Sequence, residues 1–110
     1  MKITEGYLKM EMDKKGIYTI TTLRGSLYAT HRCIGFFHEK ENAIESIEHN
    51  DGDMYEEGYY PYAVIENVLP GIYHFNSDNE VWFRWNRKLK CYKQCEKPDK
   101  FKRTVCFGIG

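Results

Sequence analysis

The side chains best suited to binding an anion lie where strands are predicted to end. His31 and Arg32 come directly after a strand-like segment at 26–30, and Arg24 follows another at 17–23. A guanidinium pairs with phosphate oxygens through two N–H groups, and an imidazole can donate a hydrogen bond to a phosphate or exchange a proton with it. The alternative is a set of strand-end residues that cap backbone groups or face solvent. The pattern indicates an anion site, and the purely structural role stays open as the alternative.

Aromatic rings gather in two further segments, YYPY at 59–62 and WFRW at 82–85. A tyrosine or tryptophan ring can stack on a nucleotide base while the arginine between the two tryptophans holds a phosphate. Large rings also build the core of a thin sheet, so packing is the alternative role for at least half of them. With the strand-end residues they predict a pocket for a small anionic, nucleotide-like ligand, lined by Arg24, His31, Arg32, Tyr60, Tyr62, Trp82 and Arg84.

The chain lacks the motifs of the common enzyme classes. It contains no Walker loop, no G-x-G-x-x-G, no G-x-S-x-G and no H-E-x-x-H. The segment that begins at Asp51 starts like a calcium loop, but Glu56 stands where an EF-hand has glycine. Cys91 and Cys95 form one close pair where a structural zinc site usually has two. We therefore expect neither a metal nor a cofactor, and we favour a binding protein over an enzyme.

Opposite charges are separated along the chain, although the formal net charge is zero. Residues 36–66 hold nine acids and one lysine, a balance of −8, and residues 82–103 hold nine basic residues and two acids, a balance of +7. The two segments either neutralise each other in the fold or form solvated faces. The sharper alternative is that the basic segment offers an anion site. Nucleic acid is a poorer partner, because an acidic helix would repel a phosphate backbone.

Length and composition predict one small domain. The chain of 110 residues has room for one hydrophobic core, so we expect a single domain over 1–110. No apolar run approaches the roughly 20 residues that span a bilayer, and the first residues lack a secretory signal. The four cysteines are then predicted to be free thiols in a reducing compartment. A cytoplasmic protein with no membrane partner is the expectation.

Hydrophobic periodicity predicts an α+β fold, with one principal helix packed on a twisted, mainly antiparallel sheet of about six or seven strands. The helix is predicted at 39–49, where Ala43, Ile44 and Ile47 share one face. Polar turns are predicted at 13–16, 69–71 and 76–79. Strand-like segments lie at 5–12, 17–23, 26–30, 33–37, 59–68, 72–75, 81–85, 89–95 and 104–109.

The strand at 81–85 alternates, and its two faces are predicted to differ. Val81, Phe83 and Trp85 fall on one face, and Trp82 and Arg84 fall on the other. Each face therefore carries an aromatic ring, and periodicity alone does not say which face meets solvent.

The segments 32–73, RCIGFFHEKENAIESIEHNDGDMYEEGYYPYAVIENVLPGIY, and 107–110, FGIG, resemble a group of small proteins from gut Firmicutes and their phages and prophages. The resemblance implies a bacterial or phage context for the protein. It implies no reaction, because it identifies no catalytic residues. Proteins of this size from phages often act as stoichiometric inhibitors, including sponges for the nucleotide signals of bacterial immunity. Capture of such a signal is the function that this setting favours.

Three functions remain open from the sequence. The first is a binding protein that sequesters an anionic nucleotide-like signal without converting it. The second is an inhibitor or adaptor that docks the acidic helix face on a basic host protein. The third is a small phosphodiesterase or transferase that uses His31 with a tyrosine or glutamate. Exposed sheet edges could also pair two copies of the chain.

Overall fold

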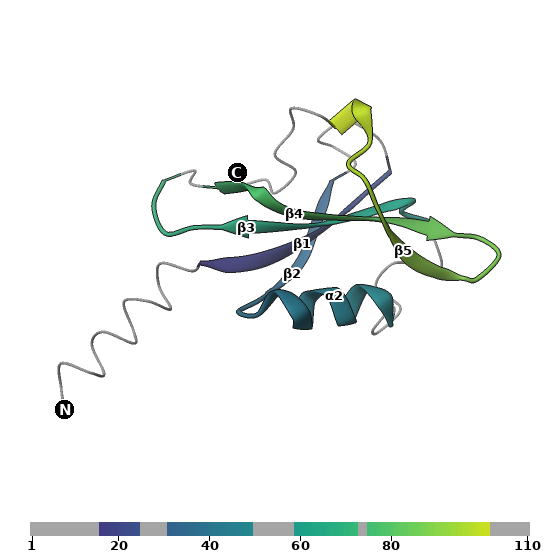
Figure 1. Cartoon of the computed structure of the whole chain (residues 1–110), viewed down its shortest axis with the longest axis horizontal. Helices are drawn as coiled ribbons and strands as arrows, with labels where there is room; N and C mark the ends of the chain where they lie inside the picture. Colours follow the sequence, from purple (N-terminus) through teal and green to yellow (C-terminus); the bar gives the residue numbers. More distant parts are fainter. Residues whose placement is uncertain (1–15, 25–30, 50–58, 73–74, 102–110) are drawn as a thin grey trace.

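The computed structural model describes residues 16–24, 31–49, 59–72 and 75–101, which form an α+β fold (Figure 1). Five strands make one antiparallel sheet in the order β2-β1-β3-β4-β5. Among these residues no helix has the length and apolar character needed to cross a membrane. The elements are β1 (Ile17–Leu23), β2 (Arg32–Phe37), α2 (Lys40–Glu48), β3 (Tyr62–Val68), β4 (Phe75–Asn86), β5 (Cys91–Cys95) and the 3-10 turn η4 (Asp99–Phe101).

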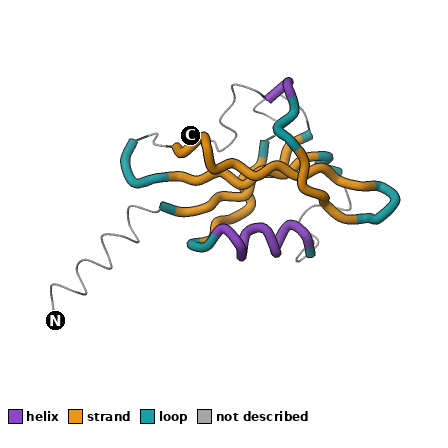
Figure 2. Tube along the Cα trace, in the orientation of Figure 1, coloured by secondary structure: helices purple, strands orange, loops and turns teal. Residues whose placement is uncertain are grey.

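The helix and the 3-10 turn lie on opposite sides of the sheet (Figure 1), as the colouring by element in Figure 2 also shows. We call the side covered by α2 the helix face, and the side on which Phe101 of η4 packs the η4 face. The central strand β3 sends successive side chains to the two faces in turn. Ala63 and Ile65 join the helix-face core, and Val64 joins the cluster on the η4 face.

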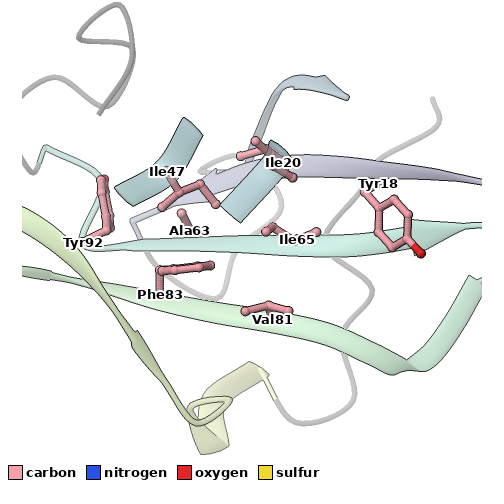
Figure 3. Close-up of a cluster of buried hydrophobic side chains, with 9 residues drawn as sticks. Tyr18, Ile20, Ile47, Ala63, Ile65, Val81, Phe83 and Tyr92 are labelled. Carbon is pink, nitrogen blue, oxygen red and sulfur yellow. The ribbon is translucent and has the colours of Figure 1, made fainter. Parts of the chain in front are cut away.

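The helix face holds the larger core, shown in Figure 3. Ile20, Ile65 and Phe83 come from three adjacent strands, and each is at most 2% exposed. Ala43 and Ile47 of α2 close over them and are themselves fully buried, which confirms the predicted apolar face of the helix. The cluster consists of Tyr18, Ile20, Ala43, Ile47, Ala63, Ile65, Val81, Phe83 and Tyr92.

The predicted alternation along β4 is confirmed. Val81 and Phe83 belong to the helix-face core, and Trp85 packs against its edge. Trp82 lies on the η4 face with Leu23 and Val64 of the neighbouring strands. Period-two patterning therefore assigned each of these side chains to its side of the sheet.

The predicted turn at 76–79 is wrong, because these residues lie within β4. Asn67 pairs with Asn76 on one side of the polar run, and Ile65 pairs with Val81 on the other. The residues at 77–80 therefore lie opposite Glu66 alone. They form an irregularity within the strand pairing, and the chain does not reverse direction there. The strand predicted at 72–75 accordingly begins at Phe75 and continues as one strand to Asn86.

The part of the chain that the structure describes contains five strands, so the count of six or seven is not confirmed. The segments predicted as strands at 5–12, 26–30 and 104–109 lie outside the described residues. Gly16 takes φ 74°, and a Cβ there would stand 2.1 Å from the carbonyl oxygen of Val68. Only glycine fits this position, and the rest of the turn predicted at 13–16 lies outside the described residues.

Candidate functional site

The sheet topology brings most of the predicted ligand-binding residues toward one end of the sheet, on both of its faces. In antiparallel order, the end of β1 and the end of β4 lie beside the starts of β2, β3 and β5. Arg24 directly follows β1, His31 directly precedes β2, and Tyr62 begins β3. Positions up to 60 residues apart in the sequence, such as Arg24 and Arg84, thus lie at the same end of the sheet. Sequence reasoning named these residues, but only the strand order shows that they converge.

Phe101 organises the η4 face at this end. Its ring stacks on Trp82 with the centroids 5.1 Å apart and an interplanar angle of 22°. Tyr62 and His31 meet the same ring edge-on, with centroid distances of 5.5 Å and 6.3 Å. The backbone N–H of Phe101 donates to the carbonyl oxygen of Pro98 over 2.9 Å, which closes the turn that presents the ring. Three predicted site residues therefore surround a phenylalanine that is fully buried.

Trp82 lies beneath this ring and is 3% exposed. Its Nε1–H is buried and has no hydrogen-bond partner within the described ranges. The Lys97 ammonium lies 5.7 Å from the centroid of the Trp82 ring, and Glu80 holds it at 3.2 Å. The indole is thus contacted by a ring and a cation, while its own donor makes no hydrogen bond.

Two cations stand side by side on the η4 face next to this cluster. Arg84 pairs across the ladder with Tyr62 on one side and with Lys93 on the other, so the three side chains form one row on one face. Arg84 and Lys93 are both exposed, and neither has a carboxylate within ion-pair distance in the described part of the chain. Like charges directly opposite each other destabilise a sheet unless an anion lies between them.

The remaining predicted residues lie apart from this row. The Arg24 guanidinium lies 4.3 Å from the centroid of the Tyr59 ring and donates to its hydroxyl over 3.1 Å. The carbonyl oxygen of Tyr60 accepts a 2.6 Å hydrogen bond from the hydroxyl of Tyr92, on the helix face. Arg32 pairs with Thr22, which places it on the helix side of edge strand β2. The structure therefore groups His31, Tyr62, Trp82 and Arg84, and it leaves Arg24, Arg32 and Tyr60 at the periphery.

Sequence reasoning missed the participation of Lys93, Lys97 and Phe101. Phe101 stands among charged residues in the sequence, and a lone aromatic residue in such a segment is the available signal for an inward-facing ring. Lys93 belongs to the basic segment that the sequence had singled out, but its position opposite Arg84 depends on the register of β4 and β5.

The acidic and basic segments do not neutralise each other through ion pairs among the described residues. Glu41, Glu45 and Glu48 are exposed on α2, and no basic side chain lies within ion-pair distance of them there. They belong to α2, which lies on the helix side of the sheet (Figure 1), whereas the strand register places Arg84 and Lys93 on the η4 face. The described residues thus contain no ion pair between these helix glutamates and the basic segment.

The cysteines are poor candidates for nucleophiles. Cys33, Cys91 and Cys95 are free thiols. Burial raises the pKa of Cys33, and the nearby Glu66 carboxylate adds to this, although the Gly35 carbonyl and the Thr21 hydroxyl oppose it. Burial likewise raises the pKa of Cys95, against the lowering effect of Arg84. Both thiols are thus protonated near neutral pH and weakly reactive. Among the residues described, no three His, Cys, Asp or Glu side chains group as metal ligands.

Comparison of the chain with family models, with curated proteins and with solved structures gives no match. The function of the site is therefore argued from its own residues.

Proposed function

We propose that this protein binds a small anionic, nucleotide-like ligand on the η4 face and does not convert it. The observation that carries the proposal is the exposed pair of Arg84 and Lys93, which face each other across the ladder beside an aromatic cluster. A phosphate between the two cations would remove their mutual repulsion and accept charge-assisted hydrogen bonds from both. The neighbouring Tyr62 ring, which is half-buried, supplies an aromatic surface of the kind on which a base stacks.

Binding without conversion is favoured because the face lacks an activated nucleophile in the described residues. The thiols of Cys33 and Cys95 have raised pKa values, which keeps them protonated. Stoichiometric capture of a nucleotide signal needs affinity alone, so a site of cations and rings is sufficient for it.

Calorimetric titration with cyclic dinucleotides, ADP-ribose and AMP tests the proposal, with matched charge-removing variants. Arg84→Gln should weaken binding of the best ligand by about tenfold, which corresponds to about 1.4 kcal/mol. Arg87→Gln removes the same charge from the exposed β4–β5 turn, and we expect it to change affinity by less than about twofold. Ligand recovered after long incubation should be intact. The proposal fails if no nucleotide binds, if both variants bind alike, or if the ligand is consumed.

An inhibitor that docks α2 on a basic host protein is the second candidate function. Glu41, Glu45 and Glu48 support it, because they are exposed on one short helix and form no ion pair with the described residues. Replacing all three by glutamine should abolish capture of such a partner and leave nucleotide affinity unchanged. Loss of nucleotide binding in that variant would contradict the separation of the two surfaces.

A further inference from the structure

The solvent side of α2 carries an acidic stripe. Glu41, Glu45 and Glu48 are exposed, and among the described residues no basic side chain lies within ion-pair distance of them. Their spacing of four and then three residues places them along one side of the helix over about 10 Å. The last turn of α2 contains no basic residue, so the Glu48 carboxylate lies at the helix end where a negative charge is unfavourable. The stripe therefore costs α2 stability within one chain.

The hairpin formed by β4 and β5 carries the opposite charge. Residues 84–93 contain five basic side chains and no acid, and all five are exposed: Arg84, Arg87, Lys88, Lys90 and Lys93. None of them has a carboxylate within ion-pair distance in the parts of the chain that the structure describes. Arg84 and Lys93 lie directly opposite each other in the ladder, and a like-charge pair in that position destabilises a sheet. From this pair to the turn the cations extend over about 10 Å, which matches the length of the acidic stripe.

The fold keeps these two surfaces apart within one molecule. The helix lies on one side of the sheet (Figure 1), and the strand register places Arg84 and Lys93 on the η4 face. A second copy of the chain brings the complementary surface to each of them. Because the formal net charge is zero, two copies approach each other without overall repulsion.

We propose that α2 of one copy docks through Glu41, Glu45 and Glu48 on the β4–β5 hairpin of a second copy. The contact joins two different surfaces, so it is head-to-tail, and each added copy presents one free surface of each sign. Exposed ion pairs are individually weak and are screened by salt, so the association depends on several pairs and on low ionic strength. The inference goes beyond the proposed function and does not rest on it, although both use Arg84 and Lys93.

Sedimentation equilibrium of the full chain tests the contact. At about 10 mM salt the mean mass should rise above that of one chain as the protein concentration increases, and at about 1 M salt it should return to that of one chain. Glu45→Gln combined with Glu48→Gln should weaken the association at least about tenfold. This variant should fold at least as stably as the parent, because it removes charge that the end of α2 disfavours. Glu96→Gln with Asp99→Gln removes the same charge from exposed positions outside α2 and should keep the association.

Charge reversal identifies the partner as a second copy. The pair Glu45→Lys and Glu48→Lys gives a chain with two basic surfaces, and the pair Arg84→Glu and Lys93→Glu gives a chain with two acidic surfaces. Each of these variants should be monomeric alone, and a mixture of the two should associate. A chain that carries all four substitutions keeps the parental net charge of zero and should associate with itself again.

The inference is overturned if the parent is monomeric at about 10 mM salt, if its mass does not respond to salt, or if the chain with all four substitutions fails to associate. A monomeric chain that retains a basic host protein through α2 would overturn it as well. AMP separates the inference from the proposed function. Self-association of a chain that binds no AMP would keep the contact and remove the nucleotide site, and AMP binding by a chain that stays monomeric would do the reverse.

Discussion

The two faces of the sheet carry different kinds of side chains. The helix face is an aliphatic and aromatic core covered by α2, and Ala43 and Ile47 seal it completely. The η4 face has a small apolar cluster of Leu23, Val64 and Trp82 beneath Phe101, and beside this cluster lie exposed cations. The helix face has the apolar packing that a stable core requires. The η4 face has exposed cations in addition to its apolar cluster, and packing alone does not require them.

The difference bears on which side of the sheet contributes more to the stability of the fold. Polar groups on the η4 face include Thr21, fully buried, and Glu66, 3% exposed, on neighbouring strands. The carbonyl oxygen of Glu66 accepts a 3.3 Å hydrogen bond from the hydroxyl of Thr19. Burying such groups costs stability unless they are paired. The helix face buries Thr22 and Asn67 as well, but its apolar cluster is the larger of the two. We therefore expect core substitutions on the two faces to have different consequences.

The largest effect is expected for Phe83→Ala on the helix face. Phe83 is fully buried between the sheet and α2, so the cavity cannot collapse, and the free energy of unfolding should fall by about 4 kcal/mol. Phe101→Ala should cost about 3 kcal/mol, because Phe101 packs in a smaller apolar cluster than Phe83 does. Urea unfolding of both variants measures the difference. Equal losses would mean that η4 is as integral to the fold as α2.

A smaller effect is expected at Lys90, in the turn that joins β4 to β5 and outside both faces. Lys90 has φ 52°, a left-handed conformation that glycine adopts without strain. Lys90→Gly should raise the free energy of unfolding by up to about 1 kcal/mol and leave nucleotide affinity unchanged. Lys90→Ala is the control, since alanine keeps the Cβ and its strain. A gain in the alanine variant as large as in the glycine variant would show that the backbone is not the cause.

The smallest effect concerns the chemistry of Cys33 on the η4 face. Its pKa is raised above the 9.0 of an unperturbed thiol, so the reactive thiolate is scarcer than in a free cysteine near neutral pH. In a variant with the other three cysteines replaced by serine, iodoacetamide should modify Cys33 more slowly than free cysteine. The rate should rise until the pH exceeds 9.0. Glu66→Gln should lower the midpoint, because the carboxylate contributes to the raised pKa. A midpoint below that of free cysteine would make this thiol a nucleophile and reopen the enzymatic alternative.

Much of the fold followed from local patterns. The alternation of Val81, Trp82 and Phe83 predicted their sides of the sheet, and the spacing of Ala43 and Ile47 predicted the buried face of α2. The polar run at 76–79 misled the same reasoning, because turn-forming residues can also form an irregularity within a ladder when flanking residues keep their pairing. Local turn propensity does not take that pairing into account, because the pairing depends on Ile65 and Asn67 of another strand.

By itself the sequence determined the periodicities, the separation of charge along the chain and the chemical types available for a site. These are properties of residues and their near neighbours. Only the tertiary structure decided that Arg84 faces Lys93, that the acidic helix lies away from both, and that Phe101 stacks on Trp82. Such contacts join segments through strand register and chain reversal, and a change of one residue in register would send every side chain of a strand to the other face.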